Sequence, residues 1–327
     1  MKKRAILCLL LIAVLSRAFP KVLASLPDLG KPTWLRVDSG YVFVSDHYSV
    51  FVYELKTLKL VTVLGKKGEG PKEFKMDPRI AVSDREIFLY SNDKVIRYSK
   101  DFTYREEVRA NFSIDRLETL EKGFVITTSQ VNAPKRYLDF RRYDTKLEKR
   151  LDLVKIQEDL TDYNFMVFSY PVCRTWKDKI FIAQRDKGFR IEVFDKNGKK
   201  LYQIEKKVEK IKAEEKHRQL DMDFILYFLG KSRFERAKRR GVFDKPMHEF
   251  MPDINSFWVK DDKIYVKTYD ITDKTERFIV LDLKGNQLKT VFLPITYRET
   301  LAFDNNVFYY LEDSEEADAW VLHGVEL

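Results

Sequence analysis

Aspartates recur at matching places along the chain and could together supply carboxylate oxygens to a metal ion. Each follows a short apolar run of a repeating pattern, at Asp46, Asp93, Asp186, Asp270 and Asp313. Carboxylates are ligands of Ca²⁺, but all ligands of one ion must lie within about 2.6 Å of it. Aspartates after strands commonly accept hydrogen bonds from their own backbone N–H groups in a turn. We therefore expect these residues to shape turns, and a shared metal site is the alternative.

The sequence offers no recognised catalytic motif. The four histidines do not have the spacing of a metal site, and they are His47, His217, His248 and His323. The Gly-x-Ser-x-Gly motif of a nucleophile elbow does not occur. The glycine-rich residues 65–70 lack the Gly-Lys-Ser/Thr ending of a phosphate-binding loop. We therefore assign no catalytic residue and no cofactor.

A strongly basic segment is the sharpest local feature of the chain. Residues 206–245 contain 13 Lys and Arg side chains against 7 Asp and Glu. Their composition predicts two helices, over residues 208–229 and 231–240, separated by Gly230. The second helix would present six cations, which are Lys231, Arg233, Arg236, Lys238, Arg239 and Arg240. Such a cluster attracts an acidic protein, an anionic glycan or a membrane surface, although charges on helices are commonly only solvated.

The composition is that of a globular protein. The 327 residues are 44% hydrophobic and include only 12 Gly and 10 Pro, which excludes a disordered or collagen-like chain. The two cysteines, Cys8 and Cys173, cannot build a disulfide framework or a thiolate metal cluster. The formal net charge is +9, and it falls to +4 without residues 1–24. Positive charge is therefore concentrated in the leader and in the basic segment.

The first 24 residues have the pattern of a secretory signal peptide. Three basic residues precede an uncharged apolar run over residues 5–15, and residues 22–24 offer a small-residue cleavage site. Eleven residues of helix span about 16 Å, well short of the roughly 30 Å of a bilayer core. Arg17 and Lys21 make the end of this leader unusually basic. We expect an exported protein, periplasmic or secreted, and an uncleaved N-terminal membrane anchor is the alternative.

One short pattern recurs six times: a turn or polar residue, then an apolar residue, a large apolar or aromatic residue, and another apolar residue. The copies lie at residues 41–44, 86–89, 123–126, 179–182, 263–266 and 306–309. Short runs of β-branched and aromatic residues bounded by turns are typical of buried strands. A second apolar and turn element follows five of the copies, which indicates units of about four strands each.

The length of these units predicts a β-propeller. Without the leader and a 45-residue insertion at residues 206–250, 258 residues remain, or 43 for each of six units, which is the size of a propeller blade. We expect an all-β fold, a six-bladed β-propeller over residues 25–327 with a helical insertion between blades 4 and 5. The sixth unit is too short for a fourth strand. Either residues 25–34 pair with the last blade, or that blade has three strands.

The junction between the first two units resembles a known family. Residues 65–74 read Gly-Lys-Lys-Gly-Glu-Gly-Pro-Lys-Glu-Phe, and a strand sequence follows at residues 78–82. This is similar to the interblade signature of exported bacterial six-bladed β-propellers, the NHL-repeat-like and TolB-like propellers. Only this junction has the full motif, while the weaker strand pattern covers most of residues 33–327. The resemblance implies the propeller fold and no particular activity.

Long connections between blades are expected to gather on one face of this propeller. They are residues 65–78, 151–170 and 206–250, and long loops on a rigid scaffold are where binding usually resides. We expect the six cations of residues 231–240, together with Lys66, Lys67 and Glu69, to bind a ligand there. The expected protein is a non-catalytic monomer that binds an extracytoplasmic protein, a peptide or an anionic ligand. Export argues against nucleic acid, and membrane association is expected only with an uncleaved leader.

An enzyme is the alternative class of function. It would be a propeller hydrolase or lyase whose metal site draws carboxylates from several blades at the axial mouth. Convergence of three or more His, Asp, Glu or Asn side chains on one point would favour it. The four tryptophans, Trp34, Trp176, Trp258 and Trp320, are interpreted as core between blades rather than as sugar platforms. Cys173 is interpreted as a small buried hydrophobic residue.

Overall fold

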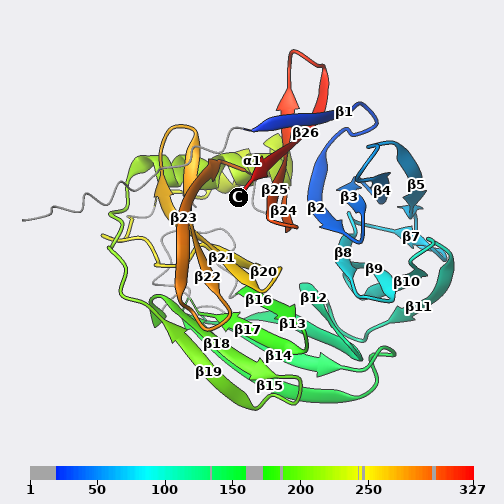
Figure 1. The fold of residues 1–327 in the computed structure, drawn as a ribbon, viewed down its shortest axis with the longest axis horizontal. Helices are drawn as coiled ribbons and strands as arrows, with labels where there is room; N and C mark the ends of the chain where they lie inside the picture. The colour runs from blue at the N-terminus through cyan, green and yellow to red at the C-terminus, as the bar shows by residue number, and fades with distance from the viewer. Residues whose placement is uncertain are drawn as a thin grey trace, which may run out of the picture.

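The structure, a computed structural model, describes residues 20–132, 135–159, 172–184, 187–241, 243–244, 247–296 and 300–327. Within these residues six four-stranded sheets are arranged as blades around a central axis (Figure 1). Each of the six repeated apolar runs lies in the second strand of a blade. The expected fold class is therefore confirmed, including the helical insertion between blades 4 and 5.

Blades 1 to 3 each begin with the innermost strand. Blade 1 contains β2 (Pro32–Asp38), β3 (Tyr41–Asp46), β4 (Ser49–Glu54) and β5 (Leu60–Leu64). Blade 2 contains β8 (Arg79–Val82), β9 (Glu86–Ser91), β10 (Lys94–Ser99) and β11 (Tyr104–Arg109). Blade 3 contains β12 (Arg116–Leu120), β13 (Gly123–Asn132), β14 (Lys135–Tyr143) and β15 (Arg150–Asp159). Residues 151–159 are thus an outer strand and not the expected loop, and residues 160–170 lie outside the described residues.

Blades 4 to 6 follow the same plan, and blade 6 borrows a strand from the start of the chain. Blade 4 contains β16 (Val172–Trp176), β17 (Lys179–Ala183), β18 (Arg190–Asp195) and β19 (Lys200–Glu205). Blade 5 contains β20 (Ser256–Lys260), β21 (Lys263–Ile271), β22 (Thr275–Asp282) and β23 (Gln287–Pro294). Blade 6 contains β24 (Leu301–Asp304), β25 (Val307–Ser314), β26 (Ala319–Glu326) and β1 (Lys21–Leu26).

The strand β1 closes the ring. It pairs antiparallel with β26, with Leu26 opposite Trp320 and Lys21 opposite Gly324. The expectation that an N-terminal segment completes blade 6 is confirmed, although the strand begins earlier than residue 25, at Lys21, and ends at Leu26. Pro32–Asp38 instead forms the inner strand of blade 1. Most of β1 therefore falls inside the 24 residues that the sequence assigned to the leader.

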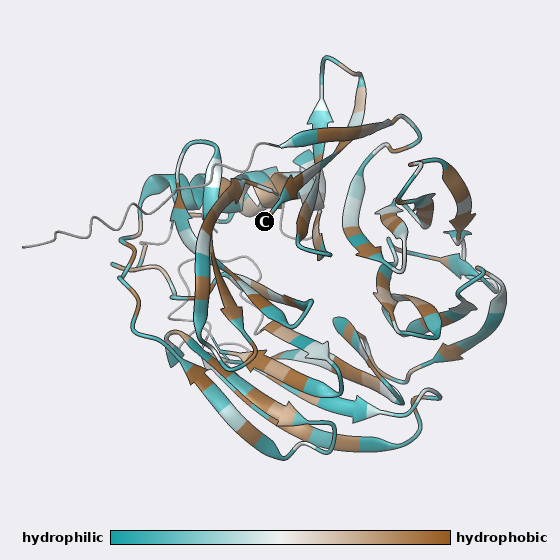
Figure 2. Cartoon of the chain, viewed as in Figure 1, coloured by the Kyte–Doolittle hydropathy of each residue, from teal (hydrophilic) through white to brown (hydrophobic). Residues whose placement is uncertain are grey.

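The hydrophobic core lies between neighbouring blades. Inner strands of successive blades contact each other around the whole ring, and each blade interface holds one cluster of buried apolar side chains. Phe181 of blade 4 and Phe257 of blade 5, for example, share one cluster and are fully buried. Apolar and polar residues alternate along many of the strands (Figure 2), as expected for strands that bury one face more than the other. Cys173 lies in the cluster between blades 3 and 4, as interpreted from the sequence.

The glycine-rich junction folds back on itself. Two short parallel strands, β6 (Lys66–Lys67) and β7 (Glu73–Phe74), bring its ends together. Gly65 has a φ of 78°, and a Cβ there would lie 2.9 Å from the Phe74 ring, so only glycine suits the position. The Gly70 amide donates to the Glu73 carboxylate at 2.8 Å, and Phe74 is buried in the core between blades 1 and 2. The family-like motif is therefore accounted for by its structural role.

The insertion contains one kinked helix, α1 (Glu215–Arg239). Glu214 and His217 form a capping box at its start, so the helix begins seven residues later than the predicted residue 208. At Gly230 the backbone leaves the helical region, with φ 74° and ψ 162°, at the break predicted from the sequence. In the part of the chain that the structure describes, no helix is long and apolar enough to cross a membrane.

Candidate functional site

The first half of α1 lies across the mouth of the propeller, over blades 5, 6 and 1. The His217 Nε2 atom lies 2.9 Å from the backbone oxygen of Tyr269 in blade 5. Further along, the Tyr227 hydroxyl donates to the backbone oxygen of Pro32 at 2.5 Å, and its ring meets Trp320 of blade 6 edge-on at 6.4 Å. In Figure 1 the helix passes behind the strands of blades 5 and 6. Aromatic and histidine contacts thus fix α1 at both ends of this half.

This mouth is on the face that carries the interblade loops. The helix follows the outer strand β19 and precedes the inner strand β20, just as the glycine-rich junction follows β5 and precedes β8. Because strands alternate in direction within every blade, all such connections emerge at the same end of the axis. The helix and the glycine-rich junction therefore share one face, as predicted.

A cavity of about 740 Å³ lies between α1 and blades 5 and 6. We call it the mouth pocket. Leu220 and Phe224 of α1 form one wall, and residues of β21, β22 and β25 form the others. Ligand pockets typically measure about 300–1,000 Å³, so the mouth pocket has the size of a binding site for a small molecule or a short peptide segment.

The mouth pocket is acidic. The carboxylates that line it are Asp221, Asp223, Asp273, Glu276, Glu312 and Asp313. Only two lysines, Lys267 and Lys274, are among the described residues of its lining. An excess of carboxylates over cations in a concave site lowers the local electrostatic potential and concentrates cations there. The charge of the pocket is thus opposite to that of the exposed basic half of α1.

Aromatic rings complete the walls of the mouth pocket. They belong to Phe224 of α1, Tyr269 of blade 5, and Tyr310 and Trp320 of blade 6. Ring faces attract cations by up to about 2 kcal/mol where the cation is desolvated. Carboxylates and aromatic faces together are suited to an ammonium or guanidinium group that is attached to an apolar body.

A buried ion pair forms one side of the mouth pocket. Lys267 Nζ and Glu276 Oε2 are 2.6 Å apart, and both residues are almost completely buried. Burial raises the pKa of the Glu276 carboxyl, and the charge of Lys267 opposes that shift. The backbone and side chain of Thr296, which also lines the pocket, lie close enough to Glu276 to oppose the rise in its pKa.

The six cations expected to bind a ligand lie beyond the kink at Gly230. Their side chains are all exposed, and among the described residues they are not part of the lining of the mouth pocket. They are Lys231, Arg233, Arg236, Lys238, Arg239 and Arg240. The structure therefore separates the charge cluster that was conspicuous in the sequence from the concave surface beside it.

The interblade residues of the expected site have partners of their own. Lys66 pairs with Glu73 at 3.3 Å, and Glu69 pairs with Lys75 at 2.6 Å. The Lys67 ammonium lies 5.1 Å from the centre of the Tyr48 ring. These contacts lie within the glycine-rich junction and blade 1, and none of them involves the cations of α1.

The recurrent aspartates lie on separate blades. Asp46 accepts hydrogen bonds from the amides of Gly30 and Lys31, and so fixes the loop before β2 rather than its own turn. Asp93 pairs with Arg109 at 3.5 Å, Asp270 pairs with Arg277 at 3.2 Å, and Asp313 lines the mouth pocket. Asp186 lies outside the described residues. Among the residues described, no group of three or more His, Cys, Asp or Glu side chains is placed to hold a metal ion.

The acidic lining of the mouth pocket was not predicted, and only part of it has a recognisable pattern in the sequence. Asp273 and Glu276 are close in sequence, in and just after the turn between β21 and β22. The remaining carboxylates come from α1 and from β25. Their convergence depends on how α1 is anchored by His217 and Tyr227, which periodicity cannot reveal.

Comparisons with known proteins add little to this picture. No protein-family model matches the sequence, and no curated protein sequence matches it. Among solved structures, the fold is similar to BamB from Moraxella catarrhalis, with a TM-score of 0.39 and 10% sequence identity over 89% of this chain and 84% of that chain. At these values the likeness carries no inference about function. The assignment of a six-bladed propeller rests on the sheet topology of the chain itself.

Proposed function

We propose that this protein is a non-catalytic binding propeller whose mouth pocket takes a cationic group attached to an apolar body. A peptide segment with a Lys or Arg next to an aromatic or aliphatic residue has this chemistry. The single observation that supports the proposal is the lining of the mouth pocket, with six carboxylates, two lysines and four aromatic rings. Binding stays on the interblade-loop face, as the sequence predicted, but the favoured ligand charge is reversed.

Charge makes the pocket selective. An anionic ligand would meet carboxylates of like sign in a site partly shielded from water, and such contacts cost several kcal/mol. A lysine or arginine side chain would instead approach Asp223 or Asp313, while its aliphatic part packs on Phe224. The exposed cations of residues 231–240 remain available to attract acidic surfaces, but they do not shape a pocket.

We also propose that the protein is exported and related to the NHL-repeat-like and TolB-like propellers. Export is supported by the basic start and the apolar run of the leader. The relationship is supported by the glycine-rich junction, where the motif forms a self-contained turn that inserts Phe74 into the core. A periplasmic or secreted location would expose the mouth pocket to peptides and to the surfaces of other exported proteins.

The alternative of a hydrolase or lyase would need a metal site at the axial mouth. Carboxylates do converge at the mouth, yet the described ones do not form a group able to hold a metal ion. Glu276 is already paired with Lys267, and Glu312 lies 2.9 Å from His323 Nε2. No specific observation therefore favours catalysis over binding.

The test is a titration with two matched peptides, Lys-Phe-Lys and Glu-Phe-Glu, followed by tryptophan fluorescence because Trp320 lines the pocket. We expect the basic peptide to bind and the acidic peptide not to bind. A D223N/D313N variant should bind the basic peptide severalfold more weakly, since two attractive charges are lost. E148Q removes an exposed carboxylate in blade 3 and serves as the control. Equal binding of both peptides, or unchanged binding by D223N/D313N, would contradict the proposal.

A further inference from the structure

The basic half of α1 begins after the kink at Gly230 and turns its charged side chains to solvent. It comprises residues 231–240, counting the C-cap Arg240. Eight of these ten side chains are exposed, Ala237 is half-buried, and only Phe234 is buried. Phe234 shares a small apolar cluster with Phe224 of the first half of the helix. The basic half is thus held to the protein through Phe234, and its cations face outward.

The charge of this half is not neutralised within the fold. Its six cations and one carboxylate, Glu235, give a formal charge of +5. In the described structure, none of the six cations takes part in an ion pair or in a side-chain hydrogen bond. Glu235 therefore lies among these cations without pairing with any of them.

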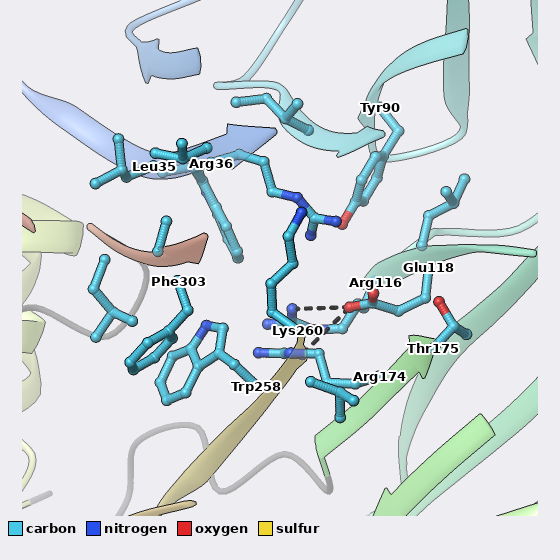
Figure 3. A pocket seen from close by; sticks show the side chains of 17 residues that line it. Leu35, Arg36, Tyr90, Arg116, Glu118, Arg174, Thr175, Trp258, Lys260 and Phe303 are labelled. Carbon is cyan, nitrogen blue, oxygen red and sulfur yellow. Dashed lines mark hydrogen bonds and ion pairs between the residues drawn. The ribbon is translucent and has the colours of Figure 1, made fainter. Parts of the chain in front are cut away.

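Basic side chains in the interior of the propeller have carboxylate partners by contrast. A small cavity of about 70 Å³ on the propeller axis is lined by basic residues of several inner strands. There Lys260 Nζ lies 2.9 Å from Asp304 Oδ1. Arg116 and Arg174 approach the same oxygen of Glu118, at 3.5 Å and 3.4 Å between nitrogen and oxygen (Figure 3). The basic half of α1 thus differs from the axial cavity in the pairing of its charges.

Helix stability accounts for only part of the basic half. Cations near the C-terminus of a helix interact favourably with its dipole, and Arg236, Lys238 and Arg239 lie in the last turn. Lys231 and Arg233 instead lie in the first turn after the kink, where the positive end of the dipole disfavours them. Like charges three or four positions apart also repel each other. The helix therefore keeps cations that reduce its own stability, which indicates a role outside the fold.

The composition of the basic half favours an extended anionic surface over a folded acidic partner. Protein interfaces are usually centred on aromatic or aliphatic side chains that the partner buries. Within residues 231–240 the one large apolar side chain, Phe234, is already buried in the protein itself. Flexible Lys and Arg side chains on an exposed helix can instead reach phosphate groups that are spread over a membrane, without a matching cavity.

The start of the chain lies at the same end of the propeller. Pro20, the first described residue, lines the mouth pocket together with Phe224 of α1, and Phe224 packs with Phe234 of the basic half. The residues before Pro20 include the basic start and the apolar run of the leader. A chain held at a membrane by this leader would therefore present the basic half of α1 to the same bilayer.

We propose that the basic half of α1 docks the propeller on a membrane surface that contains anionic phospholipids. Its cations contact the phosphate headgroups, so the association is peripheral and weakens as salt screens the charges. The leader is then not the sole membrane contact, in contrast to the expectation from the sequence. The docking surface is independent of the mouth pocket, whose charge is opposite.

The test is sedimentation of the full chain with vesicles of phosphatidylcholine that contain or lack phosphatidylglycerol. We expect stronger binding to the anionic vesicles than to the neutral ones, and a decrease of the difference as salt is added. R233Q/R236Q/R239Q removes three charges and should weaken binding to anionic vesicles about 100-fold, from the usual contribution of a basic residue near such a surface. Neutral vesicles measure the contribution of the apolar leader, which this variant leaves unchanged.

The matched control removes three exposed charges from the opposite end of the propeller. Turns between the third and fourth strands of a blade emerge at the end away from the interblade connections, because strands alternate in direction. Exposed lysines occupy such turns in blades 1, 3 and 5, and the control is K56Q/K146Q/K284Q. It should bind anionic vesicles as tightly as the unsubstituted protein does.

Equal binding to neutral and anionic vesicles would overturn the proposal, and so would equal weakening by the two triple variants. Stronger binding to soluble polyglutamate than to anionic vesicles would also overturn it, since the basic half would then select an acidic protein. None of these results bears on the peptide titration of the mouth pocket, so the two proposals can fail separately.

Discussion

At the scale of single residues, burial decides which groups can react. Cys173 is completely buried between blades 3 and 4, and burial raises the pKa of its thiol. The thiolate is the nucleophilic form of cysteine, so both its formation and its access to reagents are suppressed in the folded protein.

We therefore predict that iodoacetamide does not modify Cys173 in the native protein at neutral pH. In urea the same residue should be alkylated completely, because unfolding restores both access and an ordinary pKa. Mass spectrometry of the peptide that contains Cys173 measures both states. Rapid native alkylation would mean that the interface between blades 3 and 4 opens readily.

Protonation of His323 in blade 6 makes the stability of the fold depend on pH. Its ring stacks on Tyr310 at 4.7 Å and its Nε2 atom lies 2.9 Å from the Glu312 carboxylate. Burial lowers the pKa of His323 below its usual 6.5, and Glu312 opposes that shift without cancelling it. The unfolded chain therefore takes up a proton at a higher pH than the folded chain does.

The contribution of His323 to the free energy of unfolding is fully present above pH 6.5, the pKa of histidine in the unfolded chain. It is lost as the pH falls from there toward the lower pKa of the folded state. We predict that the free energy of unfolding in urea decreases between about pH 7.5 and about pH 5.5. The decrease should be smaller in H323Q, which cannot titrate, and the difference between the two proteins isolates the contribution of His323. A decrease of the same size in H323Q would assign the pH dependence to other groups.

At the scale of elements, the propeller depends on β1 (Lys21–Leu26), most of which falls within the residues predicted to be a leader. Leu26 of β1 is buried in the cluster between blades 6 and 1, whereas Val22 in the same strand is 62% exposed. We predict that L26A lowers the free energy of unfolding by about 2–5 kcal/mol, the usual cost of truncating a core leucine. V22A should change it very little. Equal, small effects of both substitutions would show that β1 does not close the ring.

The pairing of β1 also bears on where export would cut the chain. Cleavage after Ala24 would remove four of the six residues of β1 (Lys21–Leu26). Ser16 and Ala18 provide an alternative pair of small residues with the spacing that signal peptidase requires. We predict that the exported protein begins at Phe19, which would keep β1 whole. Sequencing of the mature N-terminus decides between Phe19 and Ser25, and a start at Met1 would indicate an uncleaved anchor.

At the scale of the whole molecule, the sequence predicted the blades but not their two cavities. The apolar runs at residues 41–44 and 263–266 form second strands because local alternation and turn chemistry determine a strand without reference to its partners. Arg116 and Trp258 lie on the short inner strands β12 and β20 of different blades. They line one cavity on the axis because six blades close into a ring. The anchoring of α1 by Tyr227 depends on an equally distant contact with Pro32.

The closed six-bladed propeller therefore carries an acidic, aromatic pocket at its mouth, beside the exposed basic half of α1. We propose that the mouth pocket, and not the exposed basic half of α1, is the surface that selects the ligand.

The most direct test is carbodiimide coupling of the Lys-Phe-Lys peptide to the protein's carboxylates, with the coupled residues identified by mass spectrometry. Carbodiimide forms an amide directly between a carboxylate and an amine without a spacer, so a bound lysine couples faster to the carboxylates beside it than to distant ones. The account predicts coupling at Asp223, Glu312 and Asp313, which line the mouth pocket, and little at the exposed Glu148 of blade 3. Coupling spread evenly over exposed carboxylates, with none of the three favoured, would contradict it.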